Sequence, residues 1–180
     1  KKRLIRRLLN CYNLTIIGLI STVLVVFLRI QDRYANFIEN YFKKSATLSY
    51  RTYIWDVAIP IIKEKLIFGY GIRNDGNFAK WKWNTWQAHN QWLQLFYDGG
   101  LICAILFLII LFMFSKRTYE YIDSHIGVLI ASIYSAFMIM MITEIFSYTP
   151  YFYIVIFIGF NMQHLVNYQG EHYLKKVRFL

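Results

Sequence analysis

The chain has 180 residues, of which 57% are hydrophobic and 17% are charged, and its mean hydropathy is +0.35. Soluble domains contain about 45–50% apolar and about 25% charged residues. The net charge of +10 would suit a nucleic-acid partner, but such proteins gather their basic residues on one wet face, whereas here they flank long apolar runs. The composition therefore excludes a disordered tail, a collagen-like chain and a disulfide scaffold. It favours a membrane protein that binds no nucleic acid.

Four apolar runs predict four transmembrane helices, because about 20 mostly apolar helical residues are needed to cross the hydrocarbon core of a bilayer. The runs cover about 8–28, 99–115, 126–143 and 145–163. Glu144 alone separates the last two runs, which we expect to form a hairpin. No signal-peptide cleavage site follows the first run, so we expect that run to be retained as a span. We predict one all-α integral membrane domain over residues 1–180, as the C-terminal portion of a longer protein.

Lys and Arg residues beside short connections predict the orientation of the spans. With four spans, the basic segments at 1–7, 116–125 and 175–178 fall on one side, which is then cytoplasmic. The long connection of about residues 29–98 falls on the other side and forms an extracytoplasmic loop. This loop carries ten Lys and Arg residues against six Asp and Glu residues, so a modest positive charge is available there for a ligand.

The loop needs secondary structure of its own, because a connection of this length without any is uncommon. Apolar spacing predicts an interfacial helix over 34–42. Possible N-cap residues at 45, 47 and 49 predict a second helix over 51–68, which Pro60 should kink and the glycines at 69 and 71 should end. A third helix is expected over 86–97, leading into the second span. The Asp-Gly-Gly sequence at 98–100 is the expected hinge between that helix and the span.

Tryptophans occur in the predicted loop and in no predicted span. Tryptophans at a membrane surface commonly form an aromatic belt. Aromatic faces also pack against the apolar faces of sugar rings, and the lysines beside two of these tryptophans would suit a glycan that carries phosphate. The two interpretations are compatible. The candidates for glycan binding or loop support are Trp55, Trp81, Trp83 and Trp86.

His89 is the histidine of the predicted loop, and histidine is the natural general base near neutral pH. The alternative is an interfacial histidine that only makes local hydrogen bonds. We place His89 at the start of the third loop helix, on the same face as Trp92 and Leu93. Asn90 is then a candidate to orient the ring or to hold a hydroxyl group.

Arg51 and Arg73 are candidates for binding a diphosphate, because a planar guanidinium grips phosphate oxygens in pairs. Arg51 lies four residues before Trp55, so a surface cation–π pair is the alternative for it. The sequence contains no Asp-x-Asp pair, no Cys/His cluster and no Gly-x-Ser-x-Gly motif. We therefore predict no bound metal, no cofactor and no serine nucleophile.

The order of these motifs resembles the C-terminal half of the O-antigen ligase and O-antigen polymerase superfamily. Arg51-x-x-x-Trp55 is followed by Phe-Gly-Tyr-Gly at 68–71, and then by Ala-His-Asn-x-Trp-Leu-Gln at 88–94 before the second span. The resemblance covers roughly residues 10–165. It implies a GT-C-like membrane glycosyltransferase that uses undecaprenyl-diphosphate-linked oligosaccharides on the outer face of the bacterial cytoplasmic (inner) membrane.

The resemblance also implies roles for single residues. His89 would activate the acceptor hydroxyl, and Arg51, with Arg73 as a looser match, would bind the diphosphate in an inverting, metal-independent transfer. The partners would be the lipid-linked oligosaccharide donor, the glycan acceptor and membrane lipids, and a chain-length regulator protein is compatible with this set. Members have about a dozen spans, so we expect these four to be inactive alone.

Three functions follow from the sequence. We favour polymerisation of repeat units for O-antigen, capsule or exopolysaccharide. An O-antigen ligase that acts on a lipid or protein acceptor is the first alternative. A non-enzymatic flippase or transporter module is the second, although a transporter should carry ionisable residues inside its spans, and these spans carry almost none.

Overall fold

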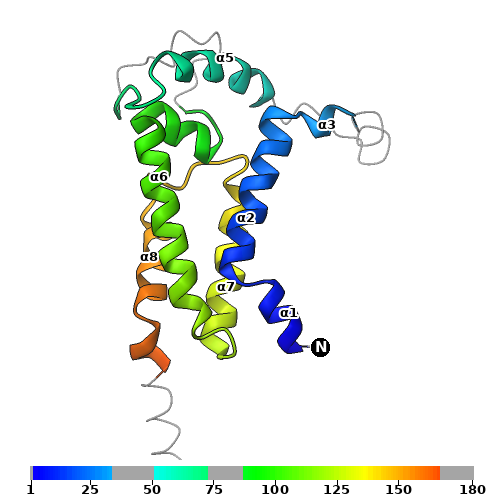
Figure 1. Ribbon diagram of the computed structural model, residues 1–180, viewed down its shortest axis with the longest axis vertical. Coiled ribbons are helices and arrows are strands. Elements are labelled where there is room, and N and C mark those ends of the chain that lie inside the picture. The colour runs from blue at the N-terminus through cyan, green and yellow to red at the C-terminus, as the bar shows by residue number, and fades with distance from the viewer. Residues whose placement is uncertain (1, 34–50, 73–86, 167–180) are drawn as a thin grey trace, which may run out of the picture.

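The structure, a computed structural model, describes residues 2–33, 51–72 and 87–166, and every regular element in these ranges is a helix. Four apolar helical segments form an elongated bundle, and α5 lies across one of its ends (Figure 1). The bundle helices are α2 (Cys11–Thr22) with its π-helical continuation η1 (Val23–Phe27), α6 (Gln91–Tyr119), α7 (His125–Met140) and α8 (Pro150–Phe160). The remaining helices are α1 (Lys2–Leu8), α3 (Ile30–Arg33) and α5 (Arg51–Glu64).

Among the described helices, α6 is the one that is long and apolar enough to span a membrane. The predicted span at 99–115 lies within it. The other three predicted spans correspond to shorter apolar helices, at Cys11–Phe27, α7 and α8. Side chains such as Leu106 and Met113 on α6 are more than half exposed, and apolar side chains exposed along a helix suit contact with lipid. Four membrane crossings and an outer position of the loop stay predictions.

The connection between α7 and α8 forms the turn of the predicted hairpin. Helix α7 ends at Met140 and α8 begins at Pro150, so residues 141–149, which include Glu144, lie between the two helices. The span bounds of about 126–143 and 145–163 stay predictions. Side chains at the start of α6 occupy main-chain N–H and C=O groups of the connection, which a continuing helix would need for its own hydrogen bonds.

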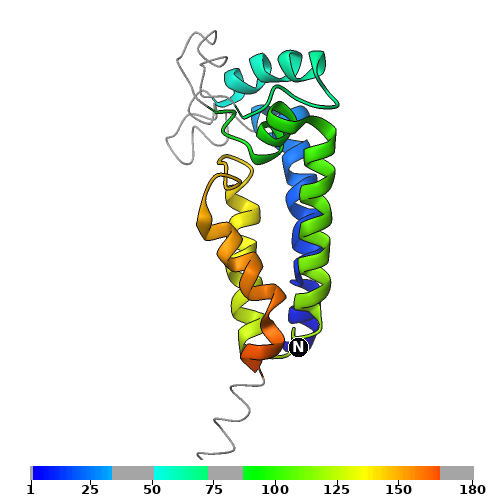
Figure 2. The ribbon, with the colours of Figure 1, turned by 90° about the vertical axis from the view of Figure 1, so that its left-hand side faces the viewer.

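The N-terminus, the α6–α7 connection and the end of α8 lie at the end of the bundle opposite α5 (Figures 1 and 2). Arg6 donates to the main-chain oxygen of Asp123 at 2.8 Å. Arg117, near the end of α6, donates to Gln163 beyond α8 at 2.9 Å. The first two basic segments used for the orientation thus share one end of the bundle, and the side of the membrane on which this end lies stays a prediction. The third, at 175–178, lies outside the described residues.

A buried polar contact links three helices of the bundle. The hydroxyl of Thr15 on α2 lies 2.7 Å from that of Tyr134 on α7 and 3.5 Å from that of Ser115 on α6. Buried polar groups are stable only when they are partnered, so this contact favours one register of the three helices. Aromatic and aliphatic side chains surround it, including Phe114 and Leu111, which are fully buried.

A second apolar core holds α5 against the bundle. One face of α5 buries Ile54, Trp55, Ala58 and Ile62 against side chains of η1 and of the start of α6. The predicted helix over 51–68 is confirmed from Arg51 to Glu64, and Pro60 lies inside it. The predicted helix over 34–42 lies outside the described residues. This second core places Arg51, the first residue of α5, near the start of α6, where the candidate site lies.

Candidate functional site

His89 lies immediately before α6, in a left-handed backbone conformation with φ of 48°. Asn90 is the N-cap, and its side-chain oxygen accepts a hydrogen bond from the N–H of Leu93 at 3.0 Å. Because an asparagine in this position satisfies a free N–H group of the first turn, the helix begins at Gln91. The prediction that His89 shares a helical face with Trp92 and Leu93 is therefore wrong. The side chain of His89 is 27% exposed, so a ligand can reach the ring.

Two buried side chains at the start of α6 hold the α7–α8 connection. Asn90 donates to the main-chain oxygen of Ile142 at 2.9 Å. The side-chain oxygen of Gln91 accepts from the N–H groups of Phe146 and Ser147 at 2.7 and 2.9 Å. The amide of Asn90 is fully buried and bonds to main chain on both sides. Asn90 therefore supports the α7–α8 connection and the start of α6. Its amide is not placed to orient the ring of His89 or to hold a ligand hydroxyl.

A carboxylate from the same connection joins the two main candidate residues. Arg51, the first residue of α5, donates from Nη2 to Oε1 of Glu144 at 2.5 Å and from Nε to the main-chain oxygen of Thr143 at 3.1 Å. The other carboxylate oxygen, Oε2, lies 3.6 Å from Nδ1 of His89. The amide nitrogen of Gln87 lies 3.4 Å from the same ring nitrogen. Arg51 and His89 thus both lie next to the carboxylate of Glu144.

Trp55 packs beneath this cluster and is fully buried. Its indole Nε1 donates to the main-chain oxygen of Ala88 at 3.0 Å, which fixes the residue just before His89. The alternative interpretation, in which Arg51 stacks on Trp55, is not what the described residues show. The guanidinium over this ring is that of Arg29, at 5.7 Å from the centroid, and Arg51 turns to the carboxylate. Trp55 therefore has a loop-supporting position, without an open face for a sugar ring.

The glycine motifs at 68–71 and 98–100 form one crossing of the backbone. Four hydrogen bonds of 2.7–3.4 Å join segments 66–71 and 97–102, among them one from the N–H of Tyr70 to the oxygen of Tyr97. Gly100 breaks α6 with φ of 63° and ψ of −157°, a conformation that is essentially confined to glycine. The predicted hinge is confirmed at this residue, and it turns the first two turns of α6 away from the long apolar part.

A second polar cluster lies one turn further along α6. Gln94 donates to Oδ1 of Asp98 at 2.9 Å and to the hydroxyl of Tyr148 at 3.0 Å, and Tyr148 donates to the other oxygen of Asp98. The side-chain oxygen of Gln94 also accepts from the N–H of Ala88 at 2.9 Å. Burial raises the pKa of the Asp98 carboxyl, and the bonds from Tyr148 and Gln94 oppose that rise. This cluster ties the residue before His89 to the end of the connection.

The sequence profile of the O-antigen ligase family matches residues 2–108, more than half of the chain. The chain belongs to the O-antigen ligase family. Members of this family are integral membrane proteins of O-antigen ligase and polymerase type. The comparisons with curated proteins and with solved structures found no match. The matched range of the family includes Arg51 and His89 and ends before Glu144.

The remaining predicted site residues lie outside the described residues. They are Arg73, Trp81, Trp83 and Trp86. Within the ranges 2–33, 51–72 and 87–166, no group of three or more His, Cys, Asp or Glu side chains is arranged to hold a metal ion. The described part of the candidate site therefore consists of a histidine, an arginine and a glutamate.

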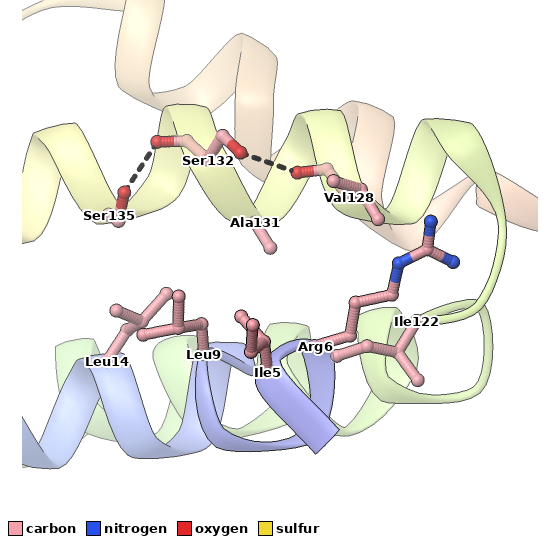
Figure 3. A pocket seen from close by; sticks show the side chains of 9 residues that line it. All are labelled: Ile5, Arg6, Leu9, Leu14, Ile122, Val128, Ala131, Ser132 and Ser135. Carbon is pink, nitrogen blue, oxygen red and sulfur yellow. Dashed lines mark hydrogen bonds between the residues drawn. The ribbon is translucent and has the colours of Figure 1, made fainter. Parts of the chain in front are cut away.

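A cavity of about 160 Å³ lies at the opposite end of the bundle, far from His89. Figure 3 shows α1 and the start of α2 along one side of the cavity and α7 along the other, with Ile122 of the α6–α7 connection near Arg6 at one end. The lining residues are Ile5, Arg6, Leu9, Leu14, Ile122, Val128, Ala131, Ser132 and Ser135. The hydroxyls of the two serines are bonded to carbonyls of α7 itself. This mostly apolar space shares no residue with the candidate site.

Glu144 is the functional candidate that the sequence alone does not identify. The sequence does contain a signal, because Glu144 is the lone charge between two apolar runs. A charge costs little at a membrane surface, so its place in a turn between two spans is enough to account for Glu144 from the sequence. Its partners Arg51 and His89 are far from it in sequence, and no local pattern predicts that they meet.

Proposed function

We propose that this chain carries the catalytic loop of a glycosyltransferase that moves a glycan from undecaprenyl diphosphate to a sugar hydroxyl. The observation that carries the proposal is the placement of Arg51 and His89 on one carboxylate, at the end of a membrane-length helix. One residue supplies a proton acceptor and the other a fixed positive charge. Transfer from a lipid diphosphate needs both functions, because a hydroxyl must lose a proton while a diphosphate departs.

His89 is the proposed general base. Its ring is partly exposed, while the cap, the Trp55 bond and the α7–α8 connection hold the backbone on both sides of it. The acceptor oxygen attacks the anomeric carbon from the face opposite the diphosphate, so the transfer inverts the configuration. The acceptor proton passes to His89, and the electron pair of the broken C–O bond leaves with the diphosphate.

Arg51 is the proposed diphosphate ligand. Its two hydrogen bonds, to Glu144 and to the main chain, use two of the five N–H groups of a guanidinium. The remaining N–H groups would meet phosphate oxygens, and the first two bonds hold the planar fork in place beforehand. We propose that this charge, together with Arg73, stabilises the leaving group in place of a metal ion.

The glycan path and the cellular setting are further parts of the proposal. Trp81, Trp83 and Trp86 would line the path of the sugar rings, and Trp55 would support the backbone before His89. We place the protein in the bacterial inner membrane with α5 and His89 on the outer face, where lipid-linked repeat units are polymerised. The description of the family as O-antigen ligase favours the alternative in which the finished polymer is transferred to another acceptor.

The test uses the full-length protein purified in detergent, with an undecaprenyl-diphosphate oligosaccharide as donor. We expect His89→Asn to lower the rate by roughly 10²–10⁴, as loss of a general base does. Asparagine is the chosen replacement because it tolerates a positive φ, so the variant removes the base without straining the backbone. We expect Arg51→Lys to fail as well, because an ammonium cannot offer the paired grip on phosphate.

Arg117→Lys is the matched control, since Arg117 also pairs with a glutamate, at the opposite end of the bundle. It should keep wild-type activity. Full activity of His89→Asn would contradict the role of His89, and full activity of Arg51→Lys would make that residue structural. A chromosomal deletion separates the two reactions: loss of a polymerase leaves single repeat units, whereas loss of a ligase leaves long polymer on the lipid carrier.

A further inference from the structure

The geometry points to Glu144 as a positioning residue that decides which nitrogen of His89 accepts a proton. The two oxygens of this carboxylate face different partners: Oε1 accepts from Arg51 at 2.5 Å, and Oε2 lies 3.6 Å from Nδ1 of His89. This inference rests on the proposed function, because it concerns the base of that reaction. Glu144 lies outside the residues that match the family profile.

The chemistry of imidazole gives the reason. A neutral ring carries one N–H and one bare nitrogen, and the partner of one nitrogen fixes the state of the other. An ionised carboxylate can only accept, so Nδ1 next to Glu144 carries the hydrogen. The lone pair then lies on Nε2, on the far side of the ring. Gln87, 3.4 Å from Nδ1, is consistent with this state, since its amide can present an oxygen in place of the nitrogen.

Arg51 fixes the orientation of the Glu144 carboxylate. It binds both Glu144 and the main-chain oxygen of Thr143, so the carboxylate cannot turn away from the ring without breaking a charge-assisted hydrogen bond. The connection that carries Glu144 is in turn held by Asn90 and Gln91, the two residues that follow His89. The base, the carboxylate and the diphosphate ligand are therefore positioned by one set of contacts.

In the transfer step, the acceptor O–H loses its proton to Nε2 of His89 as the new bond to the anomeric carbon forms. The bond from that carbon to the diphosphate oxygen breaks, and its electrons leave with the diphosphate. The ring then carries a positive charge, which the carboxylate of Glu144 stabilises through Nδ1–H. Loss of the carboxylate should lower the rate by roughly 10²-fold or more, within the range seen for general acid–base groups.

The experiment combines turnover with a direct measurement of the tautomer, on full-length protein labelled with ¹⁵N-histidine. Nitrogen shifts at a pH where the ring is neutral report which nitrogen is protonated, and the spectrum of His89→Asn identifies the signals of His89. We expect Nδ1–H in the wild type. Glu144→Gln should show a mixture of tautomers and the rate loss, and Glu144→Asp, which keeps the charge, should recover part of both.

Glu120→Gln is the control, because it neutralises a glutamate that pairs with an arginine at the other end of the bundle. It should change neither readout. Wild-type turnover and an unchanged tautomer in Glu144→Gln, with His89→Asn inactive, would overturn the role of Glu144 and leave the proposed function standing. Full activity of His89→Asn would overturn the proposed function itself, and the tautomer would then show whether the contact forms without a catalytic role.

Discussion

Gly100→Ala should destabilise the protein, because neither the backbone conformation of Gly100 nor its surroundings accommodate a Cβ atom. Gly100 has φ of 63° and ψ of −157°. A Cβ atom added there would lie 2.3 Å from the main-chain carbon and oxygen of Ile67 and 2.7 Å from the oxygen of Leu66. These are backbone atoms, which cannot turn aside as a flexible side chain could. The strain of such a conformation costs roughly 1–3 kcal/mol.

The clash adds a second cost. Segments 66–71 and 97–102 must separate to admit the methyl group, and the two hydrogen bonds next to Gly100, from the N–H groups of Leu101 and Ile102, would be the first to break. At about 0.5–1.5 kcal/mol for each bond, their loss adds about 1–3 kcal/mol. Gly71→Ala is the matched control, because Gly71 also has a positive φ, of 85°, but a Cβ atom added to it would meet no atom within 4 Å.

The assay is thermal and denaturant unfolding of the full-length protein in detergent. We expect both variants to lose stability, with the loss in Gly100→Ala larger than that in Gly71→Ala by about 1–3 kcal/mol, the contribution of the two hydrogen bonds. Equal losses in the two variants would refute the close backbone crossing. A Gly100→Ala protein as stable as the wild type would also refute the break in α6.

Two further substitutions test the packing next to the candidate site and near the opposite end of the bundle. Trp55→Phe removes the indole N–H and leaves the buried oxygen of Ala88 without its partner, so the unfolding free energy should fall by about 1–3 kcal/mol, measured by denaturant titration. Gly159→Ala places a Cβ 2.1 Å from the ring of Phe114 and should cost about 1–3 kcal/mol through overpacking. Gly18→Ala, whose Cβ would make only ordinary contacts, should be neutral or stabilising in the same titration, and a greater loss there would contradict the packing.

Local patterns in the sequence predict the helices that depend on local physics. The helix from Arg51 follows from capping residues before it and glycines after it, and the break at Gly100 follows from paired glycines. Both are confirmed, because helix ends and a positive φ depend on neighbouring residues. Helix α6 begins five residues later than predicted. The apolar periodicity begins before Asn90, but the side chain of Asn90 caps the helix, and the cap decides where the helix begins.

The candidate site depends on contacts that local patterns do not contain. Arg51 and Trp55 have the spacing of a stacked pair, yet Arg51 bonds to Glu144, and Arg29 takes the place over the indole ring. A full carboxylate offers a guanidinium a stronger partner than an aromatic face does. Helices α6 and α7 lie between Arg51 and Glu144 in the chain. They run in opposite directions along the bundle, so the carboxylate comes back to the end where Arg51 lies.

A substitution of Gln91 provides the last test. It changes the hydrogen bonds that hold the α7–α8 connection and leaves the charge of Glu144 in place. Its oxygen accepts two main-chain N–H groups of the connection, those of Phe146 and Ser147. Gln91→Leu keeps a similar volume and removes the oxygen that both N–H groups share, and each buried N–H left without an acceptor costs about 1–3 kcal/mol. We expect this variant to lose both thermal stability and turnover, because Glu144 moves with the connection.

Glu144→Gln should behave differently in the same two measurements. The ion pair of Glu144 with Arg51 is partly exposed, and such pairs contribute about 0–1 kcal/mol to stability. We therefore expect turnover to fall while the melting temperature stays near that of the wild type. Gln163→Leu, an exposed glutamine that bonds to Arg117 at the other end of the bundle, should change neither quantity. A stable, fully active Gln91→Leu protein would mean that contacts other than those of α6 bring Glu144 to His89.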